Sequence, residues 1–77
     1  MAESTCKILA VERILKQYPY GVTVNEILSL LEIKYGIKAE RKSIYSNIAV
    51  LSQFMQIDKF KGTDRKVYFC TKVGVDI

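Results

Sequence analysis

Apolar residues recur at helical spacing in three stretches of the chain, and this pattern predicts three helices. The first helix should cover about residues 6–18 and end before Pro19, because the residue preceding a proline disfavours the helical conformation. The second should begin near Val24 and end at Gly36, since glycine readily takes the left-handed conformation that closes a helix. The third should cover about residues 40–54. The residues expected to be buried are Ile8, Val11, Leu15 and Tyr18 in the first helix, Ile27, Leu28, Leu30, Leu31 and Tyr35 in the second, and Ile44, Ile48, Leu51 and Met55 in the third.

Strand-forming residues occupy two other parts of the chain. The β-branched segment 22–24 precedes the second helix and is long enough for one rung of a small sheet. Within it, Thr23 has the capping-box spacing to Glu26, which marks the start of that helix. Segments 56–61 and 65–70 are rich in Ile, Phe, Val and Tyr, and the Gly-Thr-Asp sequence between them predicts a β-hairpin. The expected order is helix, strand, helix, helix, strand, strand, which belongs to the α+β class.

The length of 77 residues predicts a single domain, residues 1–77, with a small core. Residues 1–5 are expected to fray, and residues 71–77 form a tail. In the tail, Val73, Val75 and Ile77 alternate and could pair with the sheet or with a second copy of the chain. No apolar run is long enough for a membrane span or a signal-peptide core, so we expect no membrane partner and a cytoplasmic location.

The residues that usually carry catalysis or bind metals are scarce. Histidine is absent, and the only cysteines, Cys6 and Cys70, do not form a CxxC pair. A structural zinc site therefore lacks its usual ligands, and catalysis with histidine as the base is excluded. We expect the two cysteines to be reduced packing residues rather than a disulfide, because small secreted domains use denser cysteine frameworks. The chain should thus have no enzyme activity, no catalytic residues, no metal and no cofactor.

Positive charge is concentrated in the second half of the chain. Residues 1–33 have a net charge of −1, residues 34–72 of +6 and residues 73–77 of −1, which gives the formal net charge of +4. This asymmetry favours a polyanionic partner, because lysine and arginine release counterions from phosphates. The third predicted helix and the hairpin carry most of the excess, so these two segments are where such a partner is expected to bind.

Two helices joined by a short glycine-containing turn and followed by a basic hairpin resemble the winged helix-turn-helix superfamily over essentially the whole chain. The run Arg-Lys-Ser-Ile-Tyr-Ser-Asn-Ile-Ala-Val-Leu, residues 41–51, followed by Ile57, is similar to the third helix of ferric-uptake-regulator-type repressors and of WYL-domain and DeoR-type regulators. The resemblance implies a small winged helix, with a three-helix helix-turn-helix core and a β-hairpin wing. It also implies that Ser43 contacts a phosphate and that Tyr45 reaches thymine methyl groups or the backbone. Ser46 stands where these families often have an arginine that touches DNA.

The expected interface combines a recognition helix, about residues 40–54, in the major groove with a basic wing, residues 56–70, on the sugar-phosphate backbone. Side chains opposite Ile44 on a helical wheel should face base edges. Lys42 or Gln53 could hydrogen-bond a purine, and Ala49 could contact a thymine methyl. The expected reading residues are Lys42, Ser46, Ala49 and Gln53, and the residues expected mainly to position the protein are Arg41, Ser43, Tyr45, Lys59, Lys61, Arg65 and Lys66.

These features predict a DNA-binding transcriptional regulator, cytoplasmic or nucleoid-associated. With about six phosphate contacts, the affinity should fall on the order of a thousandfold from 50 to 200 mM salt. A lone module reads few base pairs, so we also expect a homodimer, formed through the tail or through the spare apolar residues Leu9 and Ile14 of the first helix. The alternative is a winged-helix protein-protein adaptor or inhibitor that does not bind DNA and uses Tyr45, Val50 and Phe54 as its contact surface.

Overall fold

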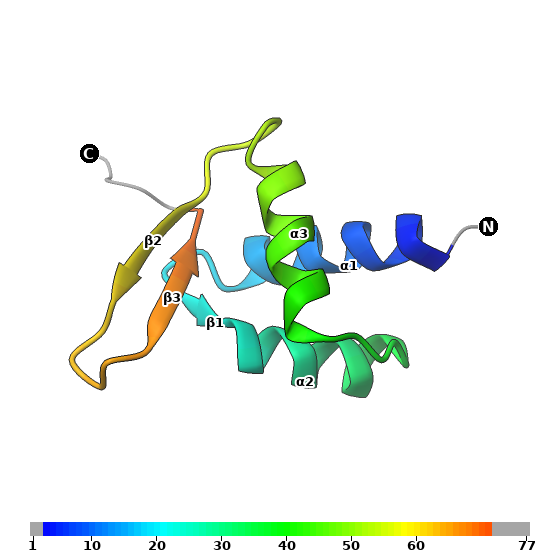
Figure 1. Cartoon of the computed structure of the whole chain (residues 1–77), viewed down its shortest axis with the longest axis horizontal. Coiled ribbons are helices and arrows are strands. Elements are labelled where there is room, and N and C mark those ends of the chain that lie inside the picture. The colour runs from blue at the N-terminus through cyan, green and yellow to red at the C-terminus, as the bar shows by residue number, and fades with distance from the viewer. Residues whose placement is uncertain (1–2, 72–77) are drawn as a thin grey trace.

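The computed structural model describes the backbone of residues 3–71 and the side chains of residues 7–71. Within these residues the protein has three helices and one three-stranded antiparallel sheet (Figure 1). The predicted α+β class and the predicted order of elements are confirmed. The helices are α1 (Glu3–Gln17), α2 (Val24–Tyr35) and α3 (Arg41–Leu51), and the strands are β1 (Val22–Thr23), β2 (Asp58–Lys61) and β3 (Val67–Cys70).

The start of α2 and its end follow from local chemistry. The Thr23 hydroxyl accepts a hydrogen bond from the backbone N–H of Glu26 (3.1 Å), and the Glu26 carboxylate accepts one from the N–H of Thr23 (3.0 Å). This capping box provides acceptors for two N–H groups that the helix itself leaves without one. At the other end, Gly36 has a φ of 65°, a left-handed conformation that glycine adopts without steric cost. Both predictions from the sequence are confirmed.

The bounds of α1 and α3 differ from those predicted. Helix α1 begins at Glu3 instead of near Cys6 and ends at Gln17. Helix α3 ends at Leu51 instead of residue 54. Beyond it the N–H groups of Gln53 and Phe54 donate to carbonyls three positions back (3.1 and 2.9 Å), which tightens the chain into turns. The expectations for residues 1–2 and 72–77 lie outside the described residues.

All three helices and the sheet share one core, whose burial is the main stabilising contribution to such a fold. Ile14, expected to be spare for a dimer, is fully buried because α1 packs against both α2 and α3. Tyr18, expected to be buried, is 39% exposed, and Leu9 remains exposed. The core consists of Ala10, Val11, Ile14 and Leu15 from α1, Val22 from β1, Val24, Ile27 and Leu31 from α2, Ile44, Ile48 and Leu51 from α3, and Phe69 from β3; Ile8, Leu28, Leu30, Tyr35 and Met55 are only partly buried against it.

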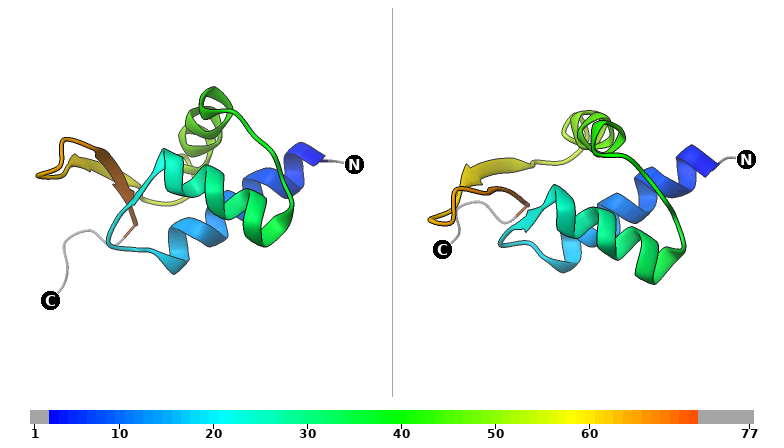
Figure 2. Two further views of the ribbon diagram at one scale, coloured as in Figure 1. Left: turned by 90° about the horizontal axis from the view of Figure 1, so that it is seen from below. Right: turned by 60° about the horizontal axis from the view of Figure 1, so that its bottom comes forward.

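The sheet has the order β1-β3-β2, with β3 in the centre. Phe69 in β3 is paired on both sides, because it lies opposite Val22 of β1 and opposite Lys59 of β2. The hairpin formed by β2 and β3 projects beyond the helices, while α3 crosses the other two helices beside it (Figures 1 and 2). The sheet is thus held to the helices through β1 and the core. The hairpin turn and β2 extend the surface next to α3.

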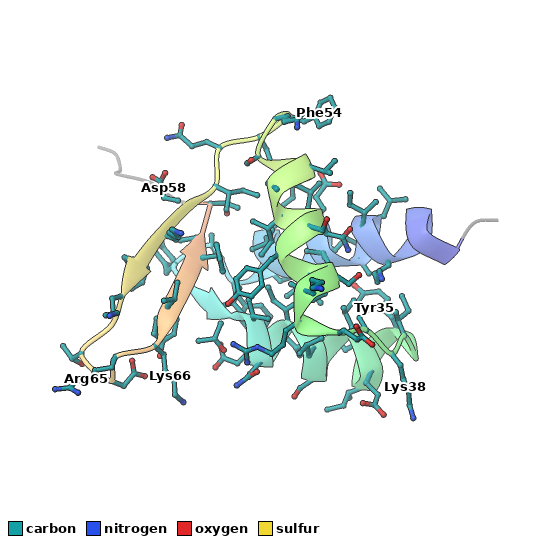
Figure 3. All side chains as sticks on the ribbon, viewed as in Figure 1. Tyr35, Lys38, Phe54, Asp58, Arg65 and Lys66 are labelled. Carbon is teal, nitrogen blue, oxygen red and sulfur yellow. The ribbon has the colours of Figure 1, made fainter. Side chains whose placement is uncertain are left out.

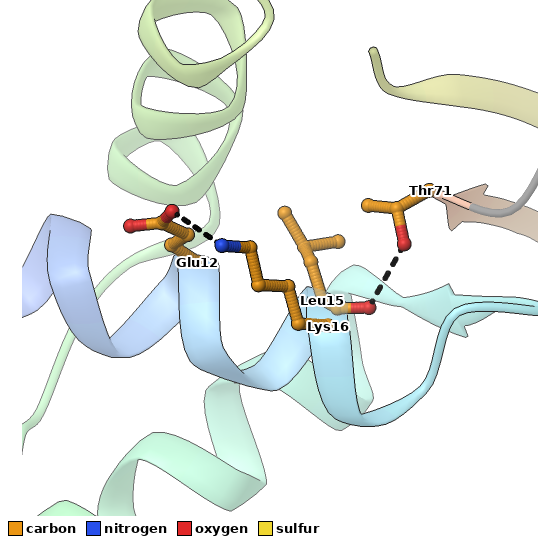
Figure 4. A network of polar contacts seen from close by, with 4 residues as sticks. All are labelled: Glu12, Leu15, Lys16 and Thr71. Carbon is orange, nitrogen blue, oxygen red and sulfur yellow. Dashed lines mark hydrogen bonds and ion pairs between the residues drawn. The ribbon is translucent and has the colours of Figure 1, made fainter. Parts of the chain in front are cut away.

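Hydrogen bonds also connect the end of β3 to α1. The backbone N–H of Thr71 donates to the Pro19 carbonyl (3.1 Å), and its hydroxyl donates to the Leu15 carbonyl (3.4 Å). An ion pair between Glu12 and Lys16 (3.1 Å) lies along the same turn of α1 (Figure 4). The two hydrogen bonds of Thr71 hold the base of the hairpin against α1 and the turn that follows it, whereas the ion pair lies within α1.

Candidate nucleic-acid interface

The outer face of α3 is short-chained and polar. Lys42, Ser46 and Ala49 are exposed, as their position opposite the buried Ile44 predicts. Gln53 is exposed as well, but it lies in the turn after the helix, so it does not continue that face. The surface that α3 offers is therefore one turn shorter than expected.

Tyr45 lies on the side of α3 that faces the sheet. Its ring packs edge-on against Phe69, with the ring centroids 6.1 Å apart and the planes at 68°, and it remains 45% exposed. Val50 is five residues further along α3, which turns it about 140° away from Tyr45 around the helix axis. The surface expected of an adaptor is consequently divided, because Tyr45 and Val50 lie on different sides of α3 and Phe54 lies in the turns after the helix.

Two residues at the start of α3 are held by contacts with other helices. The Lys7 ammonium of α1 donates a hydrogen bond to the Ser43 hydroxyl, and the Arg41 guanidinium donates to the side-chain carbonyl of Asn25 in α2. Ser43 is half-buried at this contact. Sequence reasoning missed Lys7 and Asn25, because each meets its partner only through the packing of separate helices.

Four basic residues lie in or beside the hairpin. In the antiparallel register, Lys59 lies directly opposite Phe69 and Lys61 directly opposite Val67. Residues directly opposite each other share one face of a sheet. Phe69 contacts Tyr45, so Lys59 and Lys61 are on the face turned towards α3. This juxtaposition of two strand cations with the third helix was not available from the sequence.

Arg65 and Lys66 lie in the turn of the hairpin instead of at the start of a strand (Figure 3). The turn is therefore two residues longer than the predicted Gly-Thr-Asp turn. Arg65 has a φ of 68°, a left-handed conformation that is uncommon for residues other than glycine and asparagine. The Gly62 carbonyl accepts a hydrogen bond from the Arg65 N–H (2.9 Å), which holds this turn. An arginine at such a position has a conformational cost of about 1 kcal/mol.

A small polar network orders the turn of the hairpin. The Tyr68 hydroxyl donates to one carboxylate oxygen of Asp64 (2.7 Å), and the Lys66 N–H donates to the other (3.0 Å). The bond from Tyr68 is the larger cause that holds the pKa of Asp64 below its usual 3.8, and the same bond raises the pKa of Tyr68 above its usual 10.0. The Tyr68 ring also stacks on Phe60, with centroids 5.4 Å apart and planes at 12°.

The Asp64 network should make the order of the turn depend on pH at both extremes. Because the folded pKa of Asp64 is lowered, its contribution is present above pH 3.8 and is lost as the pH falls through the lower folded value. Because that of Tyr68 is raised, its contribution is present below pH 10.0 and is lost as the pH rises through the higher folded value. In an NMR titration the Asp64 carboxyl carbon should titrate below 3.8, and Tyr68→Phe should move that midpoint upwards. The exposed Tyr20→Phe is the control; a wild-type midpoint at or above 3.8 would contradict the network.

The described residues contain little else that indicates chemistry. No group of three or more His, Cys, Asp or Glu side chains within them could hold a metal ion. Among residues 3–71, no helix has the length and apolar character needed to cross a bilayer. Cys70 is a buried free thiol, as expected for a packing residue, and its burial raises its pKa. The side chain of Cys6 lies outside the described residues.

No protein-family model, curated protein or solved structure matches this chain. The geometry of the exposed side chains is therefore what bears on function.

Proposed function

We propose that the protein is a winged-helix, double-stranded DNA-binding protein and a transcriptional regulator. In this proposal α3 enters the major groove, and the hairpin acts as the wing on the sugar-phosphate backbone. The observation that carries it is the position of Lys59 and Lys61 on the sheet face turned towards Tyr45 and α3. One surface then combines a helix that carries short polar side chains with a cationic strand. In a DNA complex the helix would contact the bases and the strand would contact the phosphates.

The reading residues in this proposal are few. Lys42, Ser46 and Ala49 face bases from α3, and Gln53 reaches them only from the following turn. Lysine can hydrogen-bond guanine, and an alanine methyl can contact a thymine methyl. Ser43 reaches a phosphate together with Lys7, whose ammonium is already bonded to it. Such a small reading surface needs a second copy or a second site to specify a long target, so we propose that the protein binds DNA as a dimer. If α1 forms the dimer contact, the exposed Leu9 takes part in it and the buried Ile14 does not.

The test is a binding selection from random duplexes at 50 and 200 mM salt, followed by anisotropy measurements on the enriched duplex. Enrichment of a motif is expected. With two to six phosphate contacts, the affinity should fall roughly tenfold to a thousandfold between these salt concentrations. An affinity independent of salt, or no enriched duplex, would overturn the proposal.

A second candidate is a protein-protein adaptor, and one observation favours it. Phe54 is 81% exposed in the turns that follow α3, far from Arg65 and Lys66 (Figure 3). A large exposed aromatic residue is a common anchor at protein interfaces. If partner binding survives charge reversal of Arg65 and Lys66 but is lost in Phe54→Ala, the adaptor function replaces DNA binding.

A further inference from the structure

An open groove of about 290 Å³ lies where the starts of α2 and α3 meet the turn of the hairpin. Three cationic side chains line it, Arg41 from the first turn of α3 and Arg65 and Lys66 from the hairpin turn. None of the eight described residues that line it is acidic. Three like charges around one space repel one another unless an anion lies among them. The charge of the lining therefore selects an anionic ligand.

The neutral lining residues add hydrogen-bond donors. Asn25 holds the Arg41 guanidinium through its carbonyl oxygen, which leaves its own amide N–H groups and further guanidinium N–H groups for a ligand. Val24 and Asn25 are the first two residues of α2, and their backbone N–H groups have no acceptor within the helix. Tyr45 contributes a phenol. Several donors around a cationic space match phosphate, whose oxygens accept several bonds at once and pair well with arginine.

A larger neighbouring hollow, of about 450 Å³, is a poorer site for such a ligand. It shares Thr23, Asn25 and Lys66 with the groove, but Glu26 and the apolar side chain of Leu30 also line it. The Glu26 carboxylate would repel an anion. The contrast between the two hollows assigns the anion to the groove that contains Arg41.

We propose that the groove lined by Asn25, Arg41, Tyr45, Arg65 and Lys66 binds one phosphate group, which the three cations share. The ligand is a phosphodiester of the DNA backbone at the point where the recognition helix meets the wing; in that form the inference rests on the proposed function. A free phosphate ion has the same chemistry and is separated from this source by the test.

The first arm of the test counts phosphates on the duplex. Arg41→Gln, Lys66→Gln and the triple variant that adds Arg65→Gln are compared with wild type by anisotropy from 50 to 200 mM salt. If the three cations share one phosphate, the triple variant should lower the slope of log affinity against log salt by about 0.9 in total and the affinity by about tenfold at 0.1 M. Three separate phosphates would give about 2.7 and on the order of several hundredfold, and this result, or no change, would overturn the shared site.

Lys34→Gln is the matched control for the loss of one positive charge. Lys34 is an exposed lysine in the last turn of α2 whose ammonium reaches Gln17 of α1 (3.5 Å) instead of the groove. The salt slope and the duplex affinity of the Lys34→Gln variant should stay at the wild-type values. Circular dichroism melts of all variants show whether each is folded, which is expected because Arg41 and Lys66 are exposed.

The second arm uses inorganic phosphate without DNA. Phosphate, compared with chloride at equal ionic strength, should shift the NMR amide signals of Val24 and Asn25, and the triple variant should abolish these shifts. If the variants bind the duplex with an unchanged salt slope and inorganic phosphate causes no NMR shifts, the phosphate site in the groove is overturned and the proposed function stands. Phosphate shifts without duplex binding would end the proposed function and leave a free-phosphate site. A slope change of about 0.9 without phosphate shifts would assign the groove to the DNA backbone alone.

Discussion

Replacing Lys59 and Lys61 together by glutamine should lower the affinity for double-stranded DNA by on the order of a hundredfold at 0.1 M salt. Both lysines are exposed on β2 and share the sheet face of Phe69, which contacts α3 through Tyr45. In the proposed complex each neutralises one phosphate, and each lost contact should also remove about 0.9 from the salt slope. Anisotropy titrations at four salt concentrations measure both quantities.

The control for this variant removes the same charge from another surface. Lys16 pairs with Glu12 on α1 and Lys34 reaches Gln17, so Lys16→Gln with Lys34→Gln should change the affinity by less than about threefold, through the long-range field alone. Equal losses for the two double variants would mean that only net charge matters. The hairpin would then have no specific part in DNA binding.

Replacing Phe69 by alanine should lower the free energy of unfolding by about 3–5 kcal/mol. The side chain is 6% exposed, belongs to the core and lies in the central strand between β1 and β2. Its loss leaves a cavity and removes the edge contact with Tyr45, which is one of the contacts between α3 and the sheet. Since small domains have about 5–15 kcal/mol in total, urea unfolding followed by circular dichroism should show a large shift of the midpoint.

Val67 provides a control for the Phe69 variant, because it lies two residues earlier on the same strand and the same sheet face but is 39% exposed. Val67→Ala should cost less than about 1 kcal/mol. A conservative Tyr45→Phe should also leave stability nearly unchanged, since the ring contact remains. If Phe69→Ala were no more destabilising than Val67→Ala, β3 would not be anchored in the core as described.

The sequence by itself determined those parts of the fold that depend on neighbours within a few residues. The spacing of Ile44, Ile48 and Leu51 placed the buried face of α3, because helical periodicity is a local property. Thr23 with Glu26 located the start of α2, and Gly36 located its end, because capping bonds join residues three to five positions apart. The sequence also showed directly that the positive charge is concentrated in the second half of the chain.

Only the tertiary structure decided how these segments meet. Ile14 is buried since two other helices cover α1, and Lys7 meets Ser43 across 36 positions of the chain. The hairpin register, which depends on contacts between strands, turned Lys59 and Lys61 towards α3. The groove with its three cations exists because the starts of two helices and the hairpin turn converge around one core, and long-range packing of this kind leaves no periodic trace in the sequence.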